Sequence, residues 1–169
     1  MPTIEGAGLG TPLQSAAAPT AGVDEVQTLT IGGTPTGGTF ALSFQGLTSN
    51  AITWTSVNAT LLAAIQGALQ GIPSIGGGGA TATAGTLTAG IGTVLITFVG
   101  SLAKKAVPNV AIADNSLTGT APTLAVAETT AGVDVTGRGA PKGALLIDTN
   151  AGALFQNTGT ASAPVWTAR

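Results

Sequence analysis

The stretch that decides the fold is EVQTLTIGGTPTGGTFALSFQ, residues 25–45. Its last part alternates strictly, because Phe40, Leu42 and Phe44 fall on one side of an extended chain and small or polar residues fall on the other. This alternation is typical of a half-buried β-strand. The first part, EVQTLTI, is rich in Thr and other β-prone residues and predicts a second strand. Between them, GGTPTGG has the composition of a connecting loop.

More strands are predicted on both sides of this stretch. NAITW at 50–54 is expected to form the next strand, and TVLITFV at 93–99 a central strand that is apolar on both faces. ATATAGTLTA at 80–89 continues the β pattern, and NVAIA at 109–113 and TLAVAE at 123–128 are expected as two shorter strands.

One segment, TSVNATLLAAIQGALQGIP at 55–73, has the period of a helix instead. We predict a helix over about 56–71, with Ser56 as its N-cap and Gly71 at its C-terminal end, before Pro73. An apolar stripe should pack this helix on the sheet. The stripe consists of Val57, Leu61, Ile65 and Leu69, flanked by Leu62, Ala68 and Ile72.

A repeated string indicates where the folded module begins and ends. TAGVD occurs at 20–24 and again at 130–134, as though the same type of linker entered and left one unit. We therefore divide the chain into an arm (1–22), a β-rich module (23–130), a linker (131–142) and a C-terminal cap (143–169). A chance repeat is the alternative, since Ala, Gly and Thr are abundant in this chain.

The predicted fold class is mainly β, of the α+β type. The module is expected to be an antiparallel sheet or sandwich with one packed helix. The cap is expected to be a β-hairpin that turns at 150–152, and such a hairpin needs another surface to pack against. The arm is expected to be extended, either as a disordered terminus or ordered along a neighbouring subunit.

Composition argues against catalysis and against a cofactor. The chain has no His, Cys or Tyr, so nucleophile–base arrangements that rely on His or Cys cannot form. Its seven acidic residues are scattered, and Asp24 and Glu25 should point to opposite faces of a strand. We expect no enzyme activity, no cofactor and no metal site. The Asp residues of the two GVD strings are expected to form local side-chain hydrogen bonds where a loop enters a strand.

Charge and hydropathy restrict the partners. A net charge of −2 with only five basic residues argues against nucleic-acid binding. The longest apolar run, GIGTVLITFVG, is about half the length of a membrane-spanning helix, so no membrane association is expected.

Charged residues are 7% of the chain against about 25% in ordinary globular proteins. A surface this neutral favours permanent assembly with other proteins, although a monomer with a neutral surface is the alternative.

Two stretches resemble structural proteins of tailed bacteriophages. GVDEVQTLTIGGTPTGGTFALSFQGLTSNAITWTSVNATLLAAIQGALQGI, residues 22–72, resembles a β-rich virion module in which a strand, a Gly-Thr hairpin and a helix follow in this order. GALLIDTNAGALFQNTGTASAPVWT, residues 143–167, resembles a short motif at the ends of capsid-decoration and fibre proteins.

This resemblance implies a capsid decoration (cement) protein on the outside of the phage head. The implied partners are the major capsid protein and further copies of the chain, with a homotrimer as the expected oligomer. The alternative is a tail or fibre component, or a host-surface adhesin. For the cap residues, a small intramolecular core is the alternative to a contact role. The candidate contact residues are Pro2, Ile4, Leu9 and Leu13 in the arm and Leu145, Ile147, Leu154, Phe155 and Trp166 in the cap.

Overall fold

The protein forms two compact units that are mainly β-structure with a single α-helix among the described residues. A computed structural model describes residues 14–15, 22–134, 141–148, 151–160 and 165–169. One unit comprises Val23–Val133, and the other comprises residues that precede and follow it. The predicted mainly β class, with antiparallel sheets and one helix, is confirmed.

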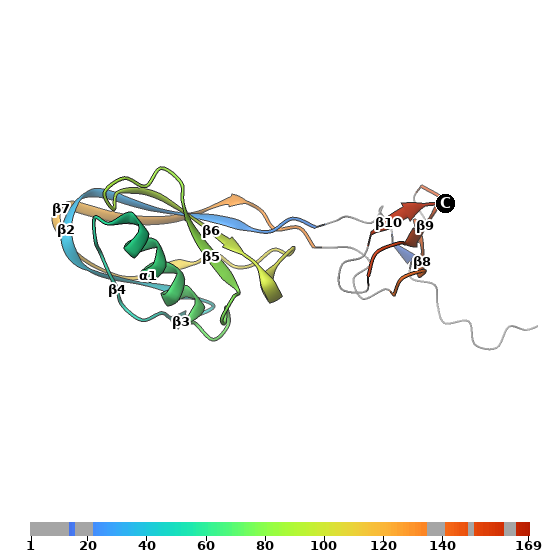
Figure 1. Ribbon diagram of the computed structural model, residues 1–169, viewed down its shortest axis with the longest axis horizontal. Helices are drawn as coiled ribbons and strands as arrows, with labels where there is room; N and C mark the ends of the chain where they lie inside the picture. Colours follow the sequence, from blue (N-terminus) through green and yellow to red (C-terminus); the bar gives the residue numbers. More distant parts are fainter. Residues whose placement is uncertain (1–13, 16–21, 135–140, 149–150, 161–164) are drawn as a thin grey trace, which may run out of the picture. The chain divides into compact units, whose positions relative to one another are not determined.

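The larger unit is organised around one long strand. Strand β2 (Val26–Phe44) pairs antiparallel with β7 (Ala111–Thr130) along nearly its whole length, and Figure 1 shows the two strands side by side. On its other edge β2 pairs first with β6 (Gly92–Phe98). Further along, the same edge pairs with the short strands β4 (Ile52–Thr53) and β3 (Leu47–Thr48). Strand β5 (Ala80–Ala84) lies beyond β6, which is therefore an interior strand, as predicted.

The segment GGTPTGG is a bend inside β2, so the prediction of a loop between two strands was wrong. Pro35 is in register with Gly119, and Gly38 with Leu117, so pairing with β7 continues through the segment. Pairing slips between Gly32 and Thr34 and again between Pro35 and Gly37, and the paired strands turn back at this end (Figure 1). Glycine suits such bulges because it accepts conformations that other residues avoid.

These bulges also change which residues face the core. Before the bend Leu29 and Ile31 are buried, and after it Phe40, Leu42 and Phe44 are buried. The inward positions thus change from odd to even numbers, which a regular strand with its two-residue period cannot do. The alternation predicted for Phe40, Leu42 and Phe44 is confirmed. The two short strands predicted at 109–113 and 123–128 are opposite ends of the single strand β7.

Helix α1 (Asn58–Gln70) lies within the predicted range, but it begins differently. Val57 occupies the N-cap position and no side chain caps the helix, so Ser56 is not the cap; Val57 is also 57% exposed and lies outside the buried stripe. The first helical residue instead holds a loop, because the side-chain amide of Asn58 donates to the carbonyl of Leu87 (2.9 Å) and accepts from the amide of Gly90 (2.9 Å). Gly71 ends the helix as predicted.

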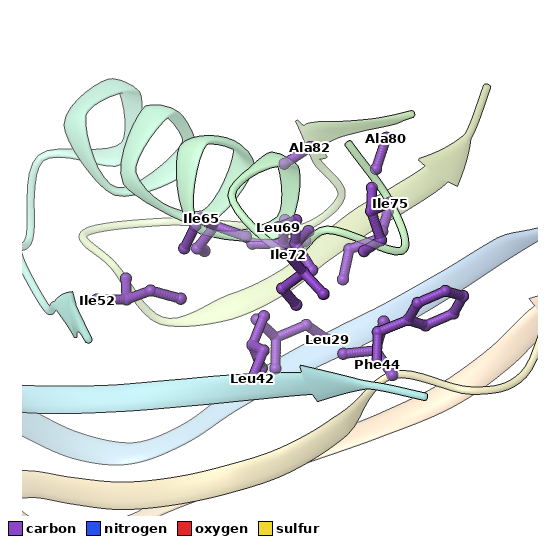
Figure 2. Close-up of a cluster of buried hydrophobic side chains, with 14 of the residues drawn as sticks. Leu29, Leu42, Phe44, Ile52, Ile65, Leu69, Ile72, Ile75, Ala80 and Ala82 are labelled. Atoms are coloured by element: carbon purple, nitrogen blue, oxygen red, sulfur yellow. The ribbon is translucent and has the colours of Figure 1, made fainter. Parts of the chain in front are cut away.

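The core lies between α1 and both halves of β2. Figure 2 shows helix side chains such as Ile65 and Leu69 directed toward Leu29 and Leu42. All four of these residues are fully buried. The cluster therefore joins the two halves of the bent strand to the helix. Other members include Phe40, Phe44, Ile52, Leu61, Ile72, Ala80, Ala82, Val94, Ile96 and Phe98.

The smaller unit contains a second sheet. Strands β8 (Leu145–Asp148) and β9 (Ala153–Asn157) form the predicted hairpin, and β10 (Trp166–Ala168) pairs antiparallel with β9. A two-residue strand of the arm, β1 (Gln14–Ser15), pairs parallel with β8. The arm thus adds a strand to the cap of its own chain, an arrangement that neither expectation for the arm included.

Two glycine substitutions test the bent ribbon. Gly119→Ala should lower the free energy of unfolding by about 3 kcal/mol, because φ is +131° and a Cβ would lie 2.2 Å from the carbonyl oxygen of Thr34. Gly67→Ala is the matched control, since a Cβ there meets nothing within 4 Å. It should raise stability by about 0.5–1 kcal/mol through helix propensity. Urea unfolding followed by circular dichroism measures both changes, and a harmless Gly119→Ala would contradict the observed bend.

Candidate protein-contact surfaces

The cap presents an apolar side chain cluster to solvent. Ile147 on β8 is in register with Leu154 on β9, and Leu145 lies two residues before Ile147, so the three side chains share one face of the sheet. Their exposed fractions are 38%, 36% and 53% respectively. We call these three residues the cap face. Three of the five cap residues that were predicted as contacts are therefore brought together on one exposed surface.

The other two predicted cap residues lie on the opposite side of the same sheet. Phe155 is in register with Leu146, which is buried, and both Phe155 and Trp166 are half-buried. Trp166 faces Asn157 across the β9–β10 pair. The structure thus separates the five residues into two faces. Leu145, Ile147 and Leu154 are available to a partner, and Phe155 and Trp166 contribute to the packing of the cap. The arm candidates Pro2, Ile4, Leu9 and Leu13 lie outside the described residues.

Two buried polar residues hold the cap strands. The side-chain oxygen of Asn157 accepts from the backbone amides of Gly159 (3.0 Å) and Val165 (2.9 Å), and its amide nitrogen donates to the carbonyl of Pro141 (3.3 Å). Asp148 accepts from the amide of Ala151 (3.0 Å) at the hairpin turn. Both residues are almost completely buried. The cap face therefore rests on strands whose ends are fixed by hydrogen bonds.

A second surface lies on the larger unit, on the side of the sheet away from the core. Because Leu29, Ile31, Val94 and Ile96 point inward, their strand neighbours point outward. We call this surface the open sheet face. It consists of Thr28 and Thr30 on β2, Thr93, Leu95 and Thr97 on β6, Thr81 and Thr83 on β5, and Ala125 and Ala127 on β7.

The open sheet face contains no charged side chain. All nine residues are half-buried or exposed, and seven of them are Thr or Leu with methyl groups, while two are Ala. Removing such groups from water costs less than removing charges, which need a compensating partner. The surface is therefore suited to close contact with another protein.

Buried polar groups at the start of β2 fix the chain that leads into β7. Glu25 is fully buried, and its carboxyl oxygens accept from the side-chain amide of Gln27 and from the backbone amide of Val107 (2.6 Å). Gln27, also fully buried, accepts from the amide of Val110 (2.7 Å) and donates to the carbonyl of Pro108 (3.1 Å). We call Glu25 and Gln27 the buried clamp.

Asp24 extends this connection at the surface. Its carboxyl oxygen accepts from the backbone amide of Lys104 (2.8 Å), a residue with a positive φ of 53°. This bond spans 80 residues of sequence, so the expectation of a purely local bond was wrong for Asp24. The opposite orientation predicted for Asp24 and Glu25 is consistent with their burial, since Glu25 alone is fully buried.

The two copies of TAGVD meet in the structure. The amide of Val23 donates to the carbonyl of Val133, and the amide of Val133 donates to the carbonyl of Val23, each at 2.9 Å. This antiparallel bridge closes the larger unit at the two points where the chain enters and leaves it. The repeat therefore has a structural counterpart in this pair of valines.

The burial of Glu25, Gln27 and Asn157 was not predicted, because overall composition does not indicate which individual polar residues are buried. A Glu and a Gln two positions apart at the start of a strand do place their side chains on one face, and that face continues with Leu29 and Ile31. This pattern was the available signal. A polar pair in line with core residues predicts buried hydrogen bonds.

Comparisons with known proteins add no relative. A scan against protein-family models finds no match, and a search of curated proteins finds no match either. Among the described residues, no helix is both long and apolar enough to cross a membrane. Among the same described residues, no group of three or more acidic side chains is arranged to hold a metal ion.

Removing the buried clamp should destabilise the larger unit. Glu25→Ala leaves the amide of Val107 and the side chain of Gln27 without their acceptor in a buried site, at a cost of about 2–3 kcal/mol. Glu128→Ala is the control, because Glu128 is exposed on β7 and its loss should change stability by no more than about 0.5 kcal/mol. Urea unfolding measures both variants. Equal stability of the two would show that the clamp contributes nothing.

Proposed function

We propose that this chain is a structural protein of a tailed-phage virion that decorates the outside of the head and stabilises it through protein–protein contacts. In this role it carries out no reaction and needs no cofactor. Its partners are the major capsid protein and further copies of itself, with a trimer as the assembly that the sequence resemblance implies. The observation that supports the proposal is an exposed, uncharged surface on each of the two compact units.

The cap face supports the proposal through its apolar side chains. Leu145, Ile147 and Leu154 are more than one-third exposed although each is large and apolar. Scattered exposed apolar residues are ordinary, but these three are adjacent on one sheet face whose polar supports, Asp148 and Asn157, are buried. A partner that covers this face would gain apolar burial with little loss of backbone freedom, because the paired β-strands already order the backbone.

The open sheet face supports the proposal in a different way. Rows of Thr run across β5, β6 and β2, for example Thr81 opposite Thr97 and Thr93 opposite Thr30. Such rows offer hydroxyl groups for hydrogen bonds and methyl groups for packing, with no charge to neutralise. This chemistry fits a neighbouring protein surface rather than a nucleic acid, which is bound by clustered Lys and Arg.

Two surfaces on one chain make attachment to a lattice firm even where each contact is weak. When one unit is bound, the second unit of the same chain stays at a high local concentration near its own site. A shell of repeated subunits supplies many such sites. Stabilisation of the shell then follows by mass action, since the chain binds the assembled form.

The location of the chain in the particle tests the proposal. Particles of the phage that encodes the chain are separated into heads and tails, and the chain is quantified by mass spectrometry in each fraction. We expect it in the head fraction at a copy number comparable to that of the major capsid protein. A few copies in the tail fraction would favour the tail or fibre alternative, and absence from both fractions would overturn a virion role.

Charges placed in the cap face should weaken attachment without unfolding the chain. The double variant Leu145→Asp, Leu154→Asp buries carboxylates in the contact, and we expect binding to heads that lack the protein to fall by more than about tenfold. Val57→Asp is the control, because Val57 is at least as exposed as Leu145 and Leu154 but lies outside both surfaces. Cosedimentation with heads measures binding, and circular dichroism confirms folding. Undiminished attachment of the double variant would exclude the cap face as a contact.

A further inference from the structure

In the sheet of the larger unit, one edge strand is covered by the helix and the other is not. At β5 the helix covers the edge, because Gln66 accepts from the backbone amide of Ala82 (3.1 Å) and Gln70 donates to the carbonyl of Ala80 (2.8 Å). These two residues of β5 are separated by one position, so their backbone groups point to the same side of the strand. The glutamines thus occupy the pairing positions that a further strand would use.

The opposite edge has no such cover. Among the described residues, β7 pairs with β2 alone. Its segment Thr123–Ala127 contains no charge and no proline, and a charged residue, Glu128, comes only after it. Natural sheets usually protect long edges with charges, prolines or covering elements. We call this segment of β7 the open edge.

The open edge also leaves part of the core incompletely covered. Leu124 and Val126 pack against the core cluster, yet both are only half-buried. Their outward neighbours Thr123, Ala125 and Ala127 are small and exposed. A strand added here would bury the rest of Leu124 and Val126 and would pair the free backbone groups. The strand must itself be uncharged, with small residues on one face and aliphatic residues on the other.

We propose that this strand is the open edge of a second copy of the chain, so that two β7 strands pair antiparallel across a two-fold axis centred on Ala125. In this register Leu124 of each copy faces Val126 of the other, and Thr123 faces Ala127, so the aliphatic residues meet on one side and the small residues on the other. Glu128 faces Pro122, so like charges do not meet. Pro122, which lacks an N–H, ends the pairing on each side.

The pairing depends on strand geometry and stands apart from the proposed virion role. On a shell it would link neighbouring copies, and in solution it would produce a dimer whose population rises with concentration. An interface of this kind is isologous. Both copies use the same surface, and every contact between two different residues occurs twice, once in each direction. A trimer formed elsewhere on the chain is compatible with it.

The absence of cysteine makes a clean cross-linking test of the full chain possible. Three single variants, Thr123→Cys, Ala125→Cys and Ala127→Cys, place thiols on the exposed side of the open edge. Under mild oxidation Ala125→Cys should link to itself, and a mixture of Thr123→Cys with Ala127→Cys should link to each other. Ala84→Cys, exposed on the covered strand β5 and outside the open sheet face, is the control. We expect linking of Ala125→Cys to be at least about tenfold faster than that of the control, because pairing raises the local thiol concentration.

A charge variant checks the result without any disulfide. Ala125→Lys places two like charges together at the two-fold axis, so the dimer measured by light scattering or sedimentation should be lost while the folded chain remains. Ala84→Lys should leave the dimer unchanged. Equal linking rates for Ala125→Cys and Ala84→Cys would overturn the proposal. Preferential self-linking of Thr123→Cys, or a wild-type chain that stays monomeric at every concentration, would overturn it as well.

Discussion

The antiparallel pairing of β2 with β7 is the constraint on which the larger unit depends. Both strands run through the bend at 32–38, so the two halves of β2 direct their buried side chains into one cluster under α1 (Figure 2). Bulges in the bend change the inward positions from odd to even numbers, which lets Leu29 and Phe40 share a core. Without the pairing, the two halves would be separate strands with a glycine-rich loop between them, and nothing in their sequence would fix the angle between them.

Buried polar groups complete this arrangement where pairing ends. Glu25 and Gln27 fix the backbone that enters β7, the Val23–Val133 bridge closes the unit, and Asn157 has the equivalent role in the cap. Each polar residue uses a side chain to satisfy backbone groups that would otherwise be unpaired. Charged residues are only 7% of the chain, and two of them, Glu25 and Asp148, are buried, so few charges are left for the surface. That division connects the fold to the proposed role in assembly, since neutral Thr, Ala and Leu surfaces can be covered by another protein at little cost.

The sequence indicated the elements well and their connections poorly. The alternation of Phe40, Leu42 and Phe44 reports burial directly, and that prediction was correct. The four-residue period of α1 was correct for Leu61, Ile65 and Leu69 and wrong for Val57, which precedes the helix and is exposed. GGTPTGG was interpreted as a loop because glycine and proline are common in loops, whereas its pairing with Leu117–Gly119 depends on residues far away in the sequence.

Pairing between distant residues also explains why the complete sheet of the cap was not predicted. Period two places Leu145 and Ile147 on one face, but the strand that Gln14–Ser15 adds beside β8 comes from the other end of the chain. Phe155 was predicted as a contact residue together with them, although its position on β9 puts it on the opposite face.

Nuclear magnetic resonance of the bend gives the most direct test of this account. If β2 is one strand bent against β7, the α-protons of Pro35 and Gly119, and those of Gly38 and Leu117, lie close enough for cross-strand nuclear Overhauser effects. We expect those signals together with slow hydrogen exchange in the amides of residues 26–31, which pair on both edges. Averaged shifts and fast exchange across residues 32–38, with no contact to β7, would show a mobile loop and contradict the account.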